Sequence, residues 1–237
     1  MSLLSIISYM CGRTNVPVPV AVMSQITDDR ILQMLRILEE EGNDLAQRGD
    51  WQGITFEATH TTSAAEDQGA VTSIATNGFR HIKNGTFWDR TSKLPILGPL
   101  SDSEWQARKG MDTTGPRYFY RMRGGKLLVN PTPPATSTWA FEYVSKNWIL
   151  GADLTTYKQY FTLDTDTVLL PEELVLMGLR WRWKKEKGLE YGEDMRTYEM
   201  QVKDALGRDG GKTVLSMDGG SRRAQPGIFV PDMSWDL

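Results

Sequence analysis

The chain has 237 residues, of which 40% are hydrophobic and 24% charged, so it is long enough to bury one substantial core or two modest ones. Its formal net charge of -3 argues against a protein whose main task is to cover phosphate with Lys and Arg. With Cys11 as the only cysteine and His60 and His81 as the only histidines, we expect no disulfide, no Cys/His metal site and no cofactor.

The N-terminal part of the chain predicts two helices. A short helix over residues 3–11 is followed by Val16–Val20, which we expect to be extended because its prolines fix φ and lack a donor. A longer helix is predicted from about Thr27 to Arg48, with Thr27 or Asp28 as its cap. Its apolar residues recur at helical spacing: Ile31, Leu35, Leu38 and Leu45.

The middle of the chain changes to short β-prone runs separated by turn signals. The two runs that flank Gly124-Gly125 predict a hairpin. Ser101 with Glu104 three residues later is a capping-box pattern, which predicts a short helix over residues 101–109. We therefore interpret residues 53–159 as an antiparallel β-domain.

Helical patterns return after Leu170. Pro171 followed by two acidic residues favours a helix start, and the helix is expected to end at Lys187 before Gly188. A second helix is predicted from about Tyr191 to Arg208 by a stripe with three- and four-residue steps: Tyr191, Met195, Tyr198, Val202 and Leu206.

The order of these elements predicts an α+β fold. The N-terminal helices have no sequential helical partner other than the C-terminal pair, so we expect residues 1–52 and 160–209 to form one helical bundle. The β-domain, residues 53–159, is then an insertion between them, and residues 210–237 form an extended arm.

Two motifs suggest chemistry but lack its requirements. Gly207–Thr213 resembles a phosphate-binding loop, yet it has three residues between the glycines and follows a helix instead of a strand. Asp164 and Asp166 suggest a hard cation, but no further carboxylate follows, so we expect a solvated turn. We expect no catalytic or metal-binding residue, and therefore no enzyme.

Residues 180–187 form the most distinctive stretch, because aromatic and basic side chains alternate there. One interpretation is a nucleic-acid-binding module in which Trp stacks on bases. The favoured one is packing in a core or an interface, because Trp181 lines up with Leu174 and Met177 on a helix and neighbouring residues point to different sides.

Several C-terminal motifs carry a resemblance to a known family. They are Phe161 with Asp164–Asp166, Leu170–Leu174, Gly178–Lys184, Lys187–Tyr191 and Tyr198-Glu199, preceded in the N-terminal helix by Leu45-Ala46 and Asp50-Trp51. Together they resemble the head-to-tail connector adaptors of tailed bacteriophages, which complete the head, and the large β-region is similar to the podovirus-like tail tubular type.

The resemblance implies a structural virion protein that is assembled in the host bacterial cytoplasm. It implies a homo-oligomer, a dodecameric ring below the portal protein, that retains packaged DNA and provides a docking surface for tail or nozzle proteins. Phage DNA would pass through the lumen without sequence-specific contact. No apolar run approaches the roughly 20 residues that cross a bilayer, so we expect no membrane contact.

Two sets of residues are candidates for contacts in such an assembly, because aromatic and Arg side chains are enriched in protein interfaces. The predicted oligomer or portal interface comprises Arg180, Trp181, Arg182, Trp183, Lys184, Tyr191 and Tyr198. The predicted docking arm comprises Arg222, Arg223, Phe229 and Trp235.

Overall fold

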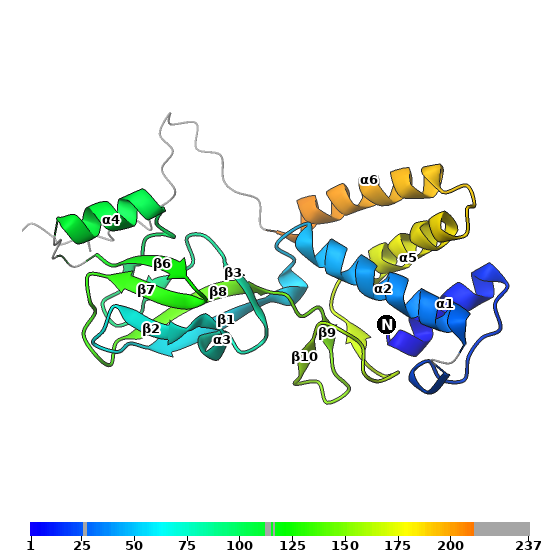
Figure 1. Ribbon diagram of the computed structural model, residues 1–237, viewed down its shortest axis with the longest axis horizontal. Helices are drawn as coiled ribbons and strands as arrows, with labels where there is room; N and C mark the ends of the chain where they lie inside the picture. The colour runs from blue at the N-terminus through cyan, green and yellow to red at the C-terminus, as the bar shows by residue number, and fades with distance from the viewer. Residues whose placement is uncertain (26–27, 112–114, 116, 211–237) are drawn as a thin grey trace, which may run out of the picture.

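The computed structural model describes residues 1–25, 28–111, 115 and 117–210. The molecule is elongated, with helices gathered at one end and β-sheets at the other (Figure 1). We call the first part the helical unit: α1 (Leu3–Thr14), η1 (Met23–Gln25), α2 (Asp29–Gln47), α5 (Glu172–Glu186), α6 (Gly192–Asp209) and the short strands β9 (Ile149–Leu150), β10 (Tyr157–Lys158) and β11 (Thr167–Val168).

The second part, which we call the β-domain, follows η2 (Gln52–Ile54). Its strands are β1 (Thr55–Thr61), β2 (Asp67–Ala70), β3 (Phe79–Ile82), β4 (Trp88–Asp89), β5 (Leu94–Pro95), β6 (Phe119–Arg123), β7 (Lys126–Asn130) and β8 (Thr138–Ser145). Its helices are α3 (Val71–Ile74) and α4 (Asp102–Gly110). The structure therefore confirms the predicted α+β class, with helices from both ends of the chain and antiparallel sheets between them.

A side-chain cap marks the start of α2, and a residue in the left-handed region marks the end of α1. The carboxylate of Asp28 accepts from the backbone N–H of Arg30 at 2.9 Å, which caps α2 as predicted. Asn15 ends α1 in the left-handed region at φ 56°. Within α2 the predicted stripe is buried, and it faces α1 and α5.

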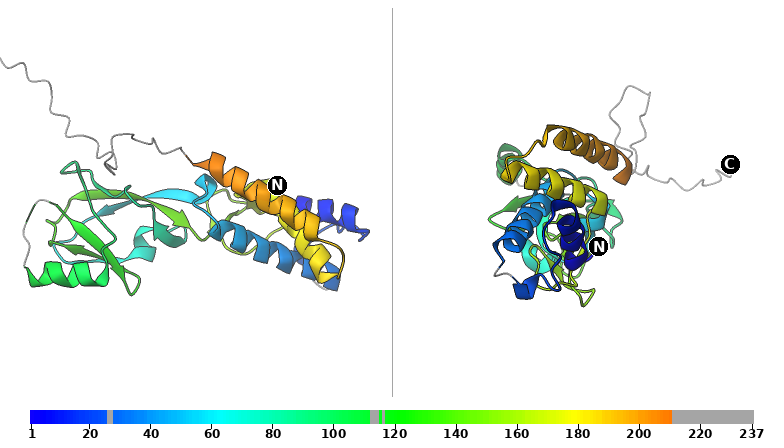
Figure 2. Two further views of the ribbon diagram at one scale, coloured as in Figure 1. Left: turned by 90° about the horizontal axis from the view of Figure 1, so that it is seen from above. Right: turned by 90° about the vertical axis from the view of Figure 1, so that its right-hand side faces the viewer.

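The helices of the helical unit form layers (Figure 2). Helix α5 packs between α2 and α6, while α1 packs against both α2 and α5. Close approach of α2 and α5 depends on Gly178, since a Cβ there would lie 2.1 Å from the carboxyl carbon of Glu41. Both ends of the chain thus meet in one core, as predicted.

Strands β1 and β8 form the long antiparallel pair of the β-domain, in register from Thr55 opposite Val144 to Thr61 opposite Thr138. Strands β4 and β5 extend this sheet, β3 also pairs with β8, and β2, β7 and β6 form a second sheet. The β6–β7 pair confirms the hairpin predicted at Gly124-Gly125. The predicted capping box of Ser101 and Glu104 is present at the start of α4.

The segment after β8 packs with the helical unit. Trp148 and Phe161 belong to the core of the helical unit, where their rings meet edge to face with centroids 5.4 Å apart. Gly42 of α2 leaves the space that the Trp148 ring fills. We therefore describe the segment after Ser145 together with the helical unit.

Among the described residues, no helix combines the length and the apolar character that a membrane crossing requires.

Candidate functional site

The predicted interface residues lie on α5 and at the start and middle of α6, but the structure divides them into two groups. Trp181, Trp183 and Tyr198 are only 6%, 5% and 0% exposed, so their side chains pack inside this chain. Arg182 is also drawn inward, into contacts with α2. Arg180, Lys184 and Tyr191 keep exposed surface.

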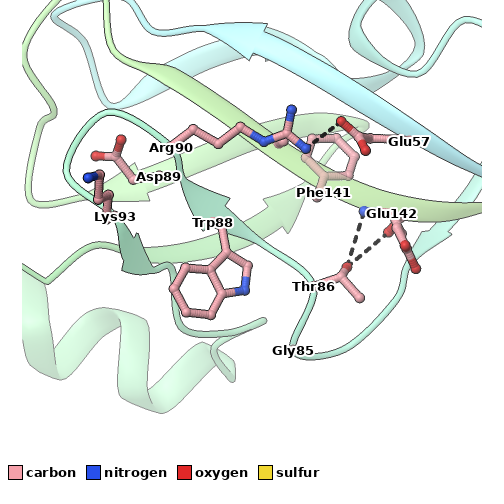
Figure 3. Close-up of a pocket in the computed structure, with 10 residues that line it drawn as sticks. Glu57, Gly85, Thr86, Trp88, Asp89, Arg90, Lys93, Phe141 and Glu142 are labelled. Carbon is pink, nitrogen blue, oxygen red and sulfur yellow. Dashed lines mark hydrogen bonds and ion pairs between the residues drawn. The ribbon is translucent and has the colours of Figure 1, made fainter. Parts of the chain in front are cut away.

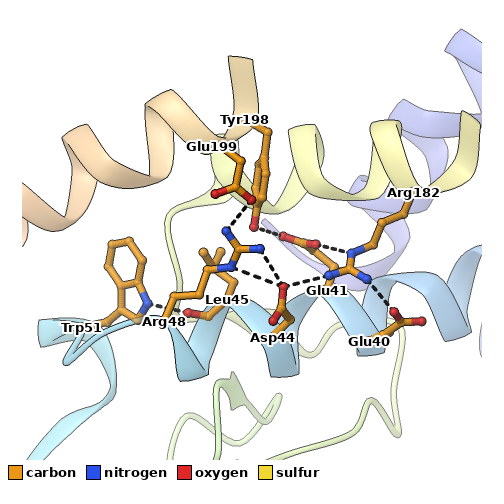
Figure 4. A network of polar contacts seen from close by, with 9 residues as sticks. All are labelled: Glu40, Glu41, Asp44, Leu45, Arg48, Trp51, Arg182, Tyr198 and Glu199. Atoms are coloured by element: carbon orange, nitrogen blue, oxygen red, sulfur yellow. Dashed lines mark hydrogen bonds and ion pairs between the residues drawn. The ribbon is translucent and has the colours of Figure 1, made fainter. Parts of the chain in front are cut away.

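Arg182 joins α5 to α2 through three carboxylates (Figure 4). Its Nε donates to Glu41 Oε2 at 2.6 Å and its Nη2 to Asp44 Oδ2 at 2.8 Å, while Nη1 donates to Glu40. The Glu41 side chain is fully buried, and buried carboxylates are rarely found without such partners.

Helix α6 is tied to the same carboxylates. The hydroxyl of Tyr198 donates to Glu41 Oε1. Arg48 donates to Glu199 at 2.6 Å and to Asp44 Oδ2 at 3.0 Å, and its guanidinium lies 5.3 Å from the centroid of the Tyr198 ring. Asp44 therefore accepts from both arginines, and the network links α2, α5 and α6.

Burial shifts the acid–base properties of this network. Burial raises the pKa of Glu41, although the hydrogen bonds from Tyr198 and Arg182 act in the opposite direction. Burial and the adjacent Glu41 carboxylate raise the pKa of Tyr198 far above its usual value, so the phenol stays protonated and donates. Because every charged member is already paired within the chain, the arrangement serves to hold the helices together.

At the outer end of α5, Arg180 and Lys184 share one carboxylate. Arg180 Nη2 lies 3.2 Å from Asp194 Oδ1, and Lys184 Nζ pairs with the other oxygen. The ring of Trp181 lies beside those of Tyr191 and Tyr198, with centroids 6.3 and 6.2 Å away. These contacts fix the turn between α5 and α6.

Asp164 lies in a turn, as predicted, but Asp166 is not solvated, and that part of the prediction was wrong. Asp166 is fully buried and accepts from Lys158 Nζ at 3.0 Å and from the backbone N–H of Thr162 at 2.9 Å. Asp164 Oδ1 accepts from the backbone N–H of Met23 at 2.8 Å. Both carboxylates are occupied in closing loops, and within the described part of the chain no group of His, Cys, Asp and Glu is placed to hold a metal ion.

The β-domain carries a hollow of about 580 Å³ beside β4 and β8 (Figure 3). Arg90 Nη2 and Glu57 Oε1 meet there at 2.6 Å, and the hydroxyl of Thr86 accepts from the backbone N–H of Glu142 at 3.1 Å. The Arg90–Glu57 pair is half-exposed, so it lacks the desolvation that prepares a general acid or base. We assign no reaction to this hollow.

The predicted docking arm, with Arg222, Arg223, Phe229 and Trp235, lies outside the described residues. The same holds for the end of the segment that resembles a phosphate-binding loop. Its beginning, from Gly207 to Asp209, is the last turn of α6.

The sequence analysis did not identify the carboxylates of α2 that bind Arg182 and Arg48. Glu41 lies three residues after Leu38 and four before Leu45, so it falls on the apolar stripe of α2. A charged residue on a buried stripe indicates a partner elsewhere in the chain. The sequence could therefore have shown that Glu41 has a buried partner, but it could not show which residue that partner is.

Comparison with curated proteins found no match. A family model described as SU10 adaptor protein matches residues 1–226, which is nearly the whole chain. This match bears out the resemblance carried by the motifs of α2, α5 and α6 and is consistent with a structural role for the paired, inward-facing network. The chain therefore belongs to the SU10 adaptor protein family and is a phage head-to-tail adaptor, a structural component of the virion.

Proposed function

We propose that this adaptor forms an oligomeric ring below the portal protein, retains packaged DNA there and provides the docking surface for tail proteins. The observation that carries the proposal is the family match over residues 1–226, which includes both the helical unit and the β-domain.

The shape and the internal bonding of the chain support this role. A ring subunit that withstands the pressure of packaged DNA must keep its shape, and the Arg182 and Arg48 ion pairs fasten three helices to one another. The elongated molecule has two separate ends, one helical and one β, so different proteins can bind at each (Figure 1). We propose that the helical unit faces the portal.

Contacts with neighbouring subunits or with the portal protein would use the exposed members of the predicted interface. Arg180, Lys184 and Tyr191 present surface to the outside, and the buried Trp181 and Tyr198 support that surface from behind. Interfaces of this kind combine an aromatic centre with a charged rim. A head-to-tail contact between copies closes into a ring when its rotation matches the subunit number.

Packaged DNA would pass such a ring without sequence-specific contact. The chain has a formal net charge of -3, which does not favour tight phosphate binding. The alternative function, a nucleic-acid-binding module at residues 180–187, needs exposed Trp faces for stacking. Trp181 and Trp183 are buried against their own chain, so we do not favour this alternative.

Co-expression of the full chain with the portal protein of the same phage, followed by electron microscopy, tests the proposal. We expect rings attached to the portal. A chain that remains monomeric and does not bind the portal would contradict it.

A further inference from the structure

A hollow of about 540 Å³ opens at the end of the helical unit that points away from the β-domain. Most of its lining comes from the C-terminal parts of α1 and α5 and the residues just after them. Both views show these two helices ending at the same end of the molecule (Figures 1 and 2). Its lining includes the apolar residues Met10, Trp183 and Leu189.

The charged residues that line this hollow are all basic: Arg13, Arg180 and Lys184. The single carboxylate of Asp194, which is outside the lining, serves both Arg180 and Lys184. Arg13 lies over the ring of Tyr9, 5.0 Å from its centroid, and within the described residues it has no carboxylate partner. The hollow therefore keeps an excess of positive charge.

The apolar part of the hollow is partly open. Leu189 is 56% exposed, whereas Met10 and Trp183 are almost fully buried behind it. A site with an apolar wall and a basic rim is complementary to a segment that carries carboxylates beside an apolar side chain.

We propose that this hollow binds an acidic segment of the portal protein, with at least two carboxylates at the basic rim and one apolar side chain against Leu189. This inference rests on the proposed function, because it assigns the surface by which the helical unit meets the portal.

Nucleic acid fits the hollow less well. The ring of Trp183 is covered by the ammonium group of Lys187, 4.5 Å from its centroid, so it offers no face to a base. Phosphate groups would satisfy the basic rim but leave Leu189 without an apolar partner. The observations therefore favour an acidic protein segment.

The test uses the double variant Arg13→Glu/Leu189→Glu, which changes two exposed side chains and leaves the buried ones in place. A matched control, Arg196→Glu/Met200→Glu, changes one exposed arginine and one exposed apolar residue on α6. Affinity of the full-length chain would be measured for three probes, namely the portal protein, the first tail protein and a short DNA duplex, at low and moderate salt.

We expect the Arg13/Leu189 variant to bind the portal protein about tenfold more weakly or worse and with a smaller salt dependence. The control variant should change the affinity for the portal protein less than about twofold, because its two residues lie outside the hollow.

Each other result overturns a defined part of the proposal. If the unmodified chain binds neither protein, the proposed function fails and the inference fails with it. If portal binding is normal and the Arg13/Leu189 variant retains it, the inference alone fails. A variant that loses only tail-protein binding, or only DNA binding, identifies a different occupant and also overturns the inference.

Discussion

The helical unit and the β-domain both have apolar cores, but the helical unit adds a network of ion pairs and hydrogen bonds to its core. In that network, the buried Glu41 and the partly exposed Asp44 accept hydrogen bonds from Arg182, Arg48 and Tyr198. At the centre of the β-domain the contacts are aromatic. The ring of Phe87 lies 5.0 Å from those of Tyr120 and Phe141 and 5.7 Å from that of Trp139, between centroids.

This difference between the two parts goes with the distance along the sequence between the residues that are in contact. Glu41 and Arg182 are 141 residues apart, whereas the β-domain closes on itself between β1 and β8. Apolar contacts are tolerant of small shifts, while buried ion pairs require one relative position of the helices. We infer that the polar network sets how the two chain ends align more than it adds to net stability.

The test with the largest expected effect replaces a large buried side chain in only one of the two cores. Phe87→Ala should lower the free energy of unfolding of the β-domain by about 3–5 kcal/mol, because a buried ring and its contacts are lost. Hydrogen exchange should quicken in β1 and β8 and stay slow in α2 and α5. The corresponding variant in the helical unit, Leu38→Ala, should quicken hydrogen exchange in α2 and α5 and leave it slow in β1 and β8. Equal loss of protection in both parts would mean that the two cores unfold as one.

The next test concerns the buried carboxylate. Glu41→Ala should lower the free energy of unfolding by about 3–5 kcal/mol, because Arg182 and Tyr198 lose a buried partner. Urea denaturation followed by far-ultraviolet circular dichroism measures the change. Glu57→Ala is the control, since it removes a half-exposed pair and should cost less than about 1 kcal/mol. Similar losses for both variants would contradict the role given to Glu41.

A third test uses pH. Burial by itself raises the pKa of Asp166, but hydrogen bonds from the Thr162 backbone and from Lys158 outweigh it and hold the pKa below its usual 3.8. A lowered pKa means that Asp166 stabilises the fold above pH 3.8 and that this contribution is lost as the pH falls through the lowered value.

Asp166→Asn should therefore cost about 1.5–3 kcal/mol at neutral pH, the usual contribution of a hydrogen bond to a charged group. The difference between variant and unmodified chain should shrink as the pH falls below 3.8, as urea titrations at several pH values would show. A difference that is constant with pH would exclude this carboxylate as the titrating group.

The smallest expected effects come from two helical glycines. Gly178→Ala places a Cβ 2.1 Å from the Glu41 carboxyl group, so overpacking should cost about 1–3 kcal/mol. Gly207→Ala in α6 meets no atom within 4 Å and should stabilise by about 0.4–1 kcal/mol. Thermal unfolding of both variants checks the opposite signs. A stabilising Gly178→Ala would show that α2 and α5 are not in close contact.

Features that depend on near neighbours in the sequence were predictable. The cap at Asp28, the capping box of Ser101 and Glu104 and the hairpin at Gly124-Gly125 each involve residues a few positions apart. The burial of Trp181 was also predictable from the sequence, because Trp181 shares a helix face with Leu174.

Features that depend on distant partners were not predictable. Periodicity places Glu41 on a buried face, but it cannot name Arg182 or Tyr198 as the groups that satisfy it. The same reason explains Trp148, whose place in the helical core follows from the space at Gly42. Asp166 was misjudged because the N–H groups of its own loop, and not solvent, surround it.

The construction of the helical unit from both chain ends has a consequence for synthesis on the ribosome. The β-domain is complete once β8 has emerged, and nothing in its main sheet waits for later residues. Helix α2 must wait for α5 and α6, which carry Arg182 and Tyr198. A chain that is interrupted before α5 therefore lacks part of the helical unit, which is the unit that we propose faces the portal.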